Sequence, residues 1–490
     1  IDAARLEAAL LGKGIPGASL KERLCALAQT ALAGGRATHD QANAIQAAMT
    51  EKVLIVTGGP GTGKTTIINA VVRLYDQLGL QVLLGAPTGR AAKRLSEVTQ
   101  REAVTIHRLL DFSWSTGGFT RNAAQPLLAD VVIVDEASML DISLLAHLLR
   151  AVPDPAVFIL VGDVDQLPSV GPGNSLRDAI ESGAFPVARL REVFRQEKES
   201  LIVANAHRVN RGEMPRSGEG SDLDYYFIEE PDPERCADRA VEICRERIPA
   251  RFGLDPIADV QVIAPMQRGT LGVQNLNARL QEALNPGGGG PAFQRGGKVF
   301  RIGDKLMQTR NNYQKKVFNG DIGLISGVDP ESRSIRVAYD GELVEYAATE
   351  LDEVIHAYAV TVHKSQGSEY PAVVVPIHTQ HYPMLQRNLI YTAMTRGKRL
   401  VVFLGTKKAL AIALNNAKVR RRWSHLAERL RREMDLPLPG PGAGTGPLSP
   451  RGEAPPDEAP PDAIYEEEVG GEAEGELPGP GELTYHPVED

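Results

Sequence analysis

The chain of 490 residues is long enough for two or three domains, each with its own core. Its formal net charge is -8, but from Pro437 onward there are 13 acidic residues and one basic residue, so residues 1–436 carry a net charge of +4. This mildly basic part is compatible with a nucleic-acid partner. The three cysteines lack metal-ligand spacing and are too few for a disulfide framework, which favours a cytoplasmic protein. No apolar run approaches the ~18 residues of a membrane span, so we expect no membrane contact.

The first 37 residues show an interrupted helical pattern, and we interpret residues 1–37 as the helical remnant of an N-terminal domain. The chain starts at Ile1 rather than Met, which suggests a fragment or a processed product. A helix is then predicted with Thr38 as its cap. Gln41 lies about one turn into this helix and 17 positions before Gly58. Its amide has both a donor and an acceptor, so it could read an adenine edge or simply face solvent.

The segment 53–66 has the sequence VLIVTGGPGTGKTT. Four aliphatic residues predict a strand buried on both faces, and a glycine-rich loop with the spacing G-x-x-x-x-G-K-T follows directly. Such a loop turns backbone N–H groups toward phosphate oxygens, and the helix beginning near Thr65 adds its positive end. Lys64 would reach the β- and γ-phosphates of a nucleotide, and the Thr65 hydroxyl would bind Mg²⁺.

Two further segments place polar residues after predicted strands. The run QVLLGAPTGRAAKRL ends a strand at the loop 87–90, where open α/β sheets bind ligands. The segment TIHRLL follows at 105–110, and its His107 could contact a ligand or be a satisfied structural histidine. Residues 111–128 are expected to form a small hairpin or loop, whose aromatic residues could touch a substrate strand or pack on the domain.

The next two aliphatic strands are each followed by candidate catalytic residues. VVIVDEASML delivers Asp135 and Glu136 to the edge where phosphates held by the first loop must lie, so one carboxylate can hold Mg²⁺ and the other can take a proton from water. The strand before Asp163 is followed by Gln166, a neutral side chain suited to sensing a γ-phosphate. Together these strands predict a P-loop domain over residues 38–188. Arg195, just beyond it, could point at the transferring phosphoryl group or be a surface arginine.

A second α/β domain is predicted over residues 189–295 and 357–435, because a new buried strand begins at VQVIAPMQRG and another follows HAYAVTVHKSQGSEY. Several β-type runs between them, with a strong hairpin turn at Asp340-Gly341, predict a small SH3-like barrel inserted at 296–356. In the loop after residue 360, polar side chains suit phosphate or sugar contacts, and Arg396 could reach across an interdomain cleft. Residues 436–490 are rich in Pro, Gly and Glu, and we expect a disordered acidic tail.

Taken together, residues 41–404 resemble superfamily-one DNA helicases of the RecD/TraA type, closest to the stand-alone RecD-like enzymes. The segments that carry the resemblance, in the order of that family, are Gln41, GGPGTGKTT, APTGRAAKRL, TIHRLL, VDEASM, GDVDQLPSVG, VFRQ, the β insert, TVHKSQGSE and YTAMTR. The resemblance implies an α/β fold with two RecA-like P-loop domains, ATP at their interface, single-stranded DNA across both, and movement in the 5′ to 3′ direction.

By matching position, the resemblance also implies residue roles. Gln41 is the implied adenine contact, Glu136 the general base, Gln166 the γ-phosphate sensor, and Arg195 and Arg396 the arginine fingers. Further contacts to the nucleotide are implied for Gly59, Gly61, Thr62, Gly63, Lys64, Thr65, Thr66 and Glu369, with Mg²⁺ on Thr65 and Asp135. The implied DNA-contacting residues are Pro87, Thr88, Thr105, His107, Thr361 and His363.

We therefore predict a cytoplasmic, monomeric ATP-dependent DNA helicase or translocase that acts on single-stranded DNA and single-strand/double-strand junctions in repair or recombination. The missing N-terminal region or the acidic tail could bind a protein partner. One alternative is an ATP-gated DNA-binding subunit of a larger complex that does not unwind DNA. Another, the helicase module of a conjugative relaxase, needs a catalytic Tyr and a His cluster that we do not find in the sequence.

Overall fold

A computed structural model of the chain describes residues 7, 11–12, 14–15, 19–32, 38–113, 118–192, 200–218, 223–287, 291–312, 314–417, 422 and 424–437. The predicted acidic tail lies almost entirely outside these residues, as do Arg195 and the rest of the VFRQ segment. Within the described part of the chain, no helix has the length and apolar character that crossing a membrane requires.

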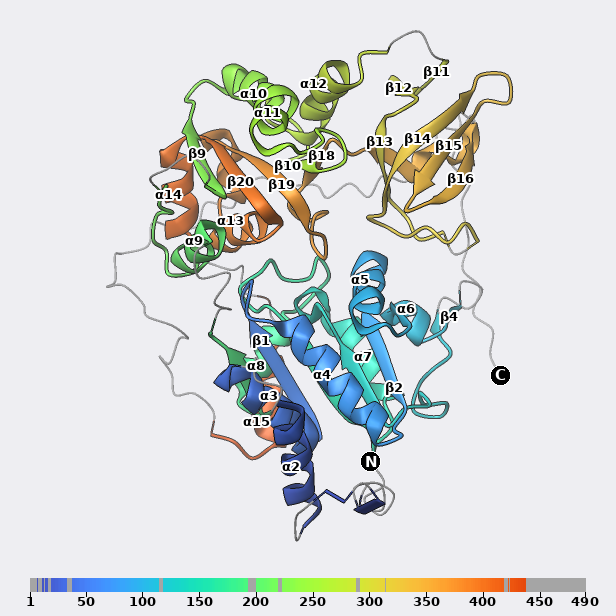
Figure 1. Cartoon of the computed structure of the whole chain (residues 1–490), viewed down its shortest axis with the longest axis vertical. Helices are drawn as coiled ribbons and strands as arrows, with labels where there is room; N and C mark the ends of the chain where they lie inside the picture. Colours follow the sequence, from blue (N-terminus) through green and yellow to red (C-terminus); the bar gives the residue numbers. More distant parts are fainter. Residues whose placement is uncertain are drawn as a thin grey trace, which may run out of the picture. The chain divides into compact units, whose positions relative to one another are not determined.

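The first of two parallel sheets is built from the predicted aliphatic strands (Figure 1). Its order is β3-β2-β6-β7-β1-β8, and every pairing within it is parallel. The strands are β1 Val53–Gly58, β2 Val82–Ala86, β3 Ala103–Thr105, β6 Val131–Val134, β7 Val157–Gly162 and β8 Val187–Leu190.

Alternate residues of β1 face two different cores, as expected for a strand covered on both sides. Leu54 and Val56 pack with helices α3 (His39–Thr50) and α4 (Lys64–Gln77), whereas Ile55 packs with α7 (Ile142–Ala151) and α8 (Ser175–Ser182). Helix α5 (Gly89–Thr99) lies against β2 and β3. Helix α2 (Leu20–Leu32) adds Leu24 and Leu27 to the first of these cores, so part of the N-terminal segment folds onto this sheet.

The second parallel sheet has the order β18-β10-β19-β20-β9. Its strands are β9 Tyr225–Glu229, β10 Val260–Ala264, β18 Ala359–Thr361, β19 Tyr370–Ile377 and β20 Gly397–Gly405. One face packs on α9 (Leu201–Asn210), α13 (Arg387–Met394) and α14 (Lys407–Asn415). The other packs on α10 (Pro233–Glu242), a π-helical turn at Ile243–Arg247, α11 (Ile248–Phe252) and α12 (Val273–Leu284), which lie together in Figure 1.

An antiparallel sheet is inserted into the second parallel one, between α12 and β18. Its order is β16-β15-β14-β13-β17, from β13 Lys305–Gln308, β14 Ile322–Asp329, β15 Ser334–Tyr339, β16 Glu342–Ala347 and β17 Val354–His356. Asp340 and Gly341 have φ angles of 46° and 94° and connect β15 to β16, which confirms the predicted hairpin turn. A separate hairpin, β11 Ala292–Arg295 with β12 Lys298–Arg301, precedes this sheet.

Shorter elements complete the described chain. In the predicted hairpin region, β4 (Phe112–Ser113) pairs with β5 (Gly118–Phe119), and α6 (Ile106–Leu109) precedes them. Three 3-10 turns lie at Ala137–Met139, Ala348–Glu353 and Thr379–Met384. The last described helix, α15 (Leu426–Glu433), follows the second sheet in sequence but contacts α8 beside the first.

Candidate functional site

The glycine-rich loop joins β1 to α4, and backbone conformation explains two of its glycines. Gly61 and Gly63 have φ angles of 70° and 80°, a region that other residues enter only with strain. Lys64 is the first residue of α4, and its Nζ donates to the carbonyl oxygens of Gly58 (2.8 Å) and Gly59 (2.9 Å). The positive charge of Lys64 is thus held at the mouth of a loop whose shape suits phosphate oxygens.

Gln41 is buried beside this loop, and both ends of its amide are engaged. Its Oε1 accepts from the backbone N–H of Thr38 in a capping box, and its Nε2 donates to Thr62 O at 2.9 Å. The solvent-facing alternative is therefore wrong, since the side chain is only 2% exposed. The structure shows a residue that fixes α3 to the phosphate loop, and an adenine contact stays a prediction.

The two acidic residues after β6 lie at the same sheet edge as the phosphate loop. Burial, together with the neighbouring Glu136, raises the pKa of Asp135, while Lys64 and Arg94 act in the opposite direction. Glu136 has a left-handed backbone with φ 51° and ψ 39°. Such a conformation in a residue with a Cβ is uncommon and is concentrated at functional sites.

A cluster of buried polar side chains connects the two parallel sheets. Arg396 Nη2 donates to Gln166 Oε1 at 3.0 Å, and Tyr391 Oη donates to Asp163 Oδ2 at 2.7 Å. Asp163 and Gln166 follow β7 of the first sheet, whereas Tyr391 and Arg396 belong to α13 and the turn after it, beside the second. The Leu167 N–H also donates to Thr392 Oγ1 at 2.9 Å. The two predicted γ-phosphate residues are therefore already in contact with each other.

Glu369, an implied nucleotide contact, is engaged by basic residues. Its carboxylate lies 2.5 Å from Arg94 Nη1 and 3.3 Å from Lys398 Nζ. Burial opposes ionisation of Glu369, but Arg94, Arg396 and Lys398 outweigh it and lower its pKa. The arginine partner on α5 was missed by the sequence reasoning, because no spacing relates residues so far apart in the chain.

The threonines predicted to contact DNA cap or close local turns. Thr88 accepts from Ala91 N at the start of α5, and Thr105 accepts from Arg108 N at the start of α6. Ala86 pairs with Thr105 across β2 and β3, so the loop containing Pro87 lies beside Thr105. From the other sheet, Gly367 approaches so closely that a Cβ on it would lie 3.1 Å from Thr88 Oγ1.

The remaining predicted DNA contacts are Thr361, His363 and His107. Thr361 ends β18, and its Oγ1 accepts from Lys364 N. Burial lowers the pKa of His363 and of His107. The His107 ring lies 6.1 Å and 5.7 Å from the rings of Phe112 and Phe119, so packing on the hairpin accounts for part of its environment.

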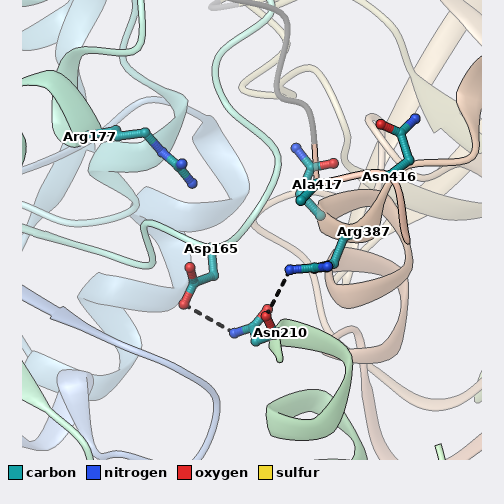
Figure 2. Close-up of a pocket in the computed structure, with 7 residues that line it drawn as sticks. Asp165, Arg177, Asn210, Arg387, Asn416 and Ala417 are labelled. Atoms are coloured by element: carbon teal, nitrogen blue, oxygen red, sulfur yellow. Dashed lines mark hydrogen bonds between the residues drawn. The ribbon is translucent and has the colours of Figure 1, made fainter. Parts of the chain in front are cut away.

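A cavity of about 170 Å³ lies beside the loop after β7 and was not predicted (Figure 2). Asn210 Nδ2 donates to Asp165 Oδ2 at 3.1 Å, and Arg387 Nη1 donates to Asn210 O at 3.4 Å. No residue of the phosphate loop lines this cavity, so it is distinct from the expected nucleotide site. Its lining residues are Asp165, Arg177, Asn210, Arg387, Asn388, Asn416 and Ala417.

A parallel sheet whose first strand leads through this glycine loop into a helix, with acidic residues after a neighbouring strand, defines the class of P-loop nucleotide-binding proteins. Family models agree. Residues 41–172 match an AAA domain, residues 276–339 match the SH3 domain of ATP-dependent RecD-like DNA helicases, and residues 356–404 match the C-terminal domain of UvrD-like helicases.

The relatives are more specific. The chain is 39% identical to the ATP-dependent RecD2 DNA helicase of Deinococcus radiodurans over 394 residues, which cover 80% of this chain and 52% of that protein. It is 33% identical to the RecBCD enzyme subunit RecD of Mycobacterium tuberculosis over 417 residues, which cover 78% of this chain and 71% of the relative. The chain belongs to the RecD family, which confirms the resemblance inferred from its motifs.

The chain spans about half the length of the Deinococcus relative. Among solved structures, one that describes DNA unwinding at forked double-stranded DNA by two coordinating Pif1 helicases matches with 18% identity and a TM-score of 0.49, over 81% of this chain and 97% of the other.

Proposed function

We propose that this chain is an ATP-dependent DNA helicase or translocase that moves 5′ to 3′ on single-stranded DNA and unwinds duplex DNA. The observation that carries the proposal is the direct contact of Arg396 and Tyr391 with Gln166 and Asp163, which links the helicase segments of one parallel sheet to those of the other. A motor of this type needs such a connection, since nucleotide binding must change the relation between its two domains. The polarity comes from the RecD family alone.

We assign each parallel sheet to one RecA-like domain, with boundaries at 38–188 for the first and at 189–295 with 357–435 for the second. The antiparallel insert at 296–356 is the SH3-like domain. The family model for that domain matches 276–339 instead, so it starts within α12 and stops at the end of β15. The end of our range follows the sheet, whose last strand, β17, ends at His356, and its start lies in the turn of the β11–β12 hairpin.

The residues near the loop fit ATP with Mg²⁺. Mg²⁺ prefers a few protein oxygens together with phosphates and water, and the hydroxyl of Thr65 and carboxylate of Asp135 are suitable donors. When bound, the ion supplies positive charge to the phosphates. In our proposal Lys64 exchanges the carbonyls of Gly58 and Gly59 for phosphate oxygens, and Glu136 takes the proton of the attacking water.

Arg396 and Gln166 are proposed to act together at the terminal phosphate. The guanidinium stabilises charge that develops during transfer, and the neutral amide senses whether the phosphate is present. Because the two side chains are hydrogen-bonded to each other, a change at either one alters the other. Loss of the phosphate would therefore change side-chain positions next to both sheets. Arg195 remains a second proposed arginine finger.

Single-stranded DNA is proposed to contact Thr88 and Thr105 beside the first sheet and Thr361 at the end of β18 in the second. Contacts from hydroxyls and helix starts suit phosphate and sugar rather than base edges, so we expect little base specificity. We further propose that the protein is a cytoplasmic monomer that acts in repair or recombination. A protein partner would bind through its N-terminal region or its acidic tail.

The first experiment measures ATP hydrolysis with and without single-stranded DNA, in Mg²⁺ buffer. We expect hydrolysis that DNA stimulates in the wild type. Stimulated hydrolysis without strand displacement would instead support an ATP-gated DNA-binding subunit, a possibility that the relationship to a RecBCD subunit keeps relevant. No hydrolysis in either condition would refute both functions.

A further inference from the structure

Helix α9 connects the second parallel sheet to the nucleotide loop of the first. Ser200 caps it, and its apolar residues Ile202, Ala206 and Val209 are buried in the core of the second sheet. His207 lies between Ala206 and Val209 in the sequence of this helix, but its ring lies against the phosphate loop. A Cβ placed on Gly59 would lie 3.5 Å from His207 Cε1 and 3.1 Å from Tyr391 Oη. The ring is thus next to the second glycine of the loop.

One nitrogen of this ring makes no hydrogen bond to the described residues. Nε2 of His207 is shielded from solvent and has no hydrogen-bond partner among the described residues. Buried polar atoms normally have a hydrogen-bond partner. An atom without one requires an explanation, such as a bound ligand that supplies the missing partner. The residue as a whole is half-buried.

The surroundings favour a neutral ring that can still donate a hydrogen bond. Burial lowers the pKa of His207, Arg211 lowers it further, and Asp163 opposes both. A neutral imidazole carries one N–H, and Nε2 can hold it. A neutral donor complements a phosphate oxygen without competing with the nearby Lys64 for charge.

The position of Lys64 indicates which phosphate of ATP would lie next to His207. In this motif the lysine reaches the β- and γ-phosphates, and here its Nζ lies on the carbonyls of Gly58 and Gly59. Gly59 is therefore at the end of the loop where the terminal phosphates belong. His207 approaches the same glycine from the second sheet.

We infer that His207 is a nucleotide-contacting residue whose Nε2 donates a hydrogen bond to the terminal phosphate of ATP. The inference rests on the proposed function and adds a contact from α9. Three residues further along this helix, Asn210 holds Asp165 in the loop that carries Gln166 (Figure 2). Phosphate binding at His207 is thereby transmitted to that loop through one rigid turn of helix.

The test is the affinity of the full chain for a fluorescent non-hydrolysable ATP analogue and for the matching ADP, both with Mg²⁺. His207→Phe keeps a planar ring and removes both nitrogens. We expect it to weaken binding of the ATP analogue by about tenfold, the scale of one hydrogen bond to a charged group, and to change ADP binding by less than about twofold. His207→Gln offers an amide near the position of Nε2 and should restore most of the loss.

The matched control is His39→Phe, the same change at an exposed histidine, which should bind both nucleotides as the wild type does. If His207→Phe binds the ATP analogue with wild-type affinity, or loses ADP equally, the inference is wrong. If His207→Phe does not fold, as judged by circular dichroism, His207→Asn replaces it with the same expected selective loss. Failure of the wild type to bind either nucleotide would refute the proposed function itself, which separates the two outcomes.

Discussion

Replacing Arg396 with Ala tests the contact that the proposed motor depends on. Arg396 is 3% exposed, and its guanidinium donates to Gln166 Oε1 and Ser368 O at 3.0 Å each, to Thr392 O at 3.2 Å and to Thr395 Oγ1 at 3.3 Å. Thr392 O keeps another donor, Thr395 Oγ1, in the variant. The substitution therefore leaves two buried acceptors, on Gln166 and Ser368, without this donor.

An unpaired buried acceptor costs about 1–3 kcal/mol, so we expect the free energy of unfolding to fall by about 2–6 kcal/mol, measured in urea. We expect the loss of catalytic rate to be larger than this loss of stability alone would cause. An arginine finger contributes about 10³–10⁵ to kcat, so kcat for DNA-stimulated hydrolysis should fall by at least about 10³.

The assay is steady-state ATP hydrolysis at saturating single-stranded DNA, at a temperature where the variant is folded. Arg396→Lys is the informative companion, because it keeps the charge and loses the planar fork; we expect it to remain strongly impaired. A folded Arg396→Ala protein that keeps more than about a tenth of the wild-type kcat would refute the assignment of Arg396 as a finger.

The remaining predictions concern the nucleotide loop, the acidic pair and the insert. Lys64→Ala should abolish ATP turnover and leave binding of single-stranded DNA largely intact, and wild-type turnover would exclude the nucleotide assignment. Glu136→Gln should bind ATP and hydrolyse it about 10²–10⁴-fold more slowly, in a single-turnover assay, because it loses general-base help. Gly89→Ala would place a Cβ on Phe318 of the insert and should lower the free energy of unfolding by about 1–3 kcal/mol in urea. Gly118→Ala is its control, since a Cβ there meets no atom of the described residues within 4 Å, and equal stability of the two variants would contradict the close packing.

Local patterns allowed much of the fold to be predicted. In the run Val53–Val56 the last three residues are buried, on both faces of the sheet as the composition indicates, and the turn at Asp340-Gly341 forms the expected hairpin. These features depend on neighbours in sequence, such as the alternation of residues in a strand or the positive φ that Gly allows. The loop before Lys64 was also predictable from neighbouring residues, because the spacing of its glycines determines its shape.

The contacts between sheets could not be predicted in this way. Tyr391 and Asp163 are 228 residues apart, and nothing in either local segment indicates that they meet. The hydrogen-bond partners of Gln41 were also not predictable from its sequence context. Its amide suited an adenine edge, but a backbone carbonyl and a backbone N–H also satisfy it, and sequence alone cannot rank these partners. His207 was overlooked because a single histidine on an apolar helix resembles an ordinary core residue.

The most direct test of the account is strand displacement by the wild-type chain, with ATP and Mg²⁺, from duplexes that carry a single-stranded overhang at either the 5′ or the 3′ end. Lys64→Ala and a reaction without ATP serve as controls. We expect displacement from the 5′-overhang duplex, none from the 3′-overhang duplex, and none in either control. Displacement only from the 3′ overhang would contradict the proposed direction, and no displacement from either duplex, despite DNA-stimulated hydrolysis, would contradict the helicase activity.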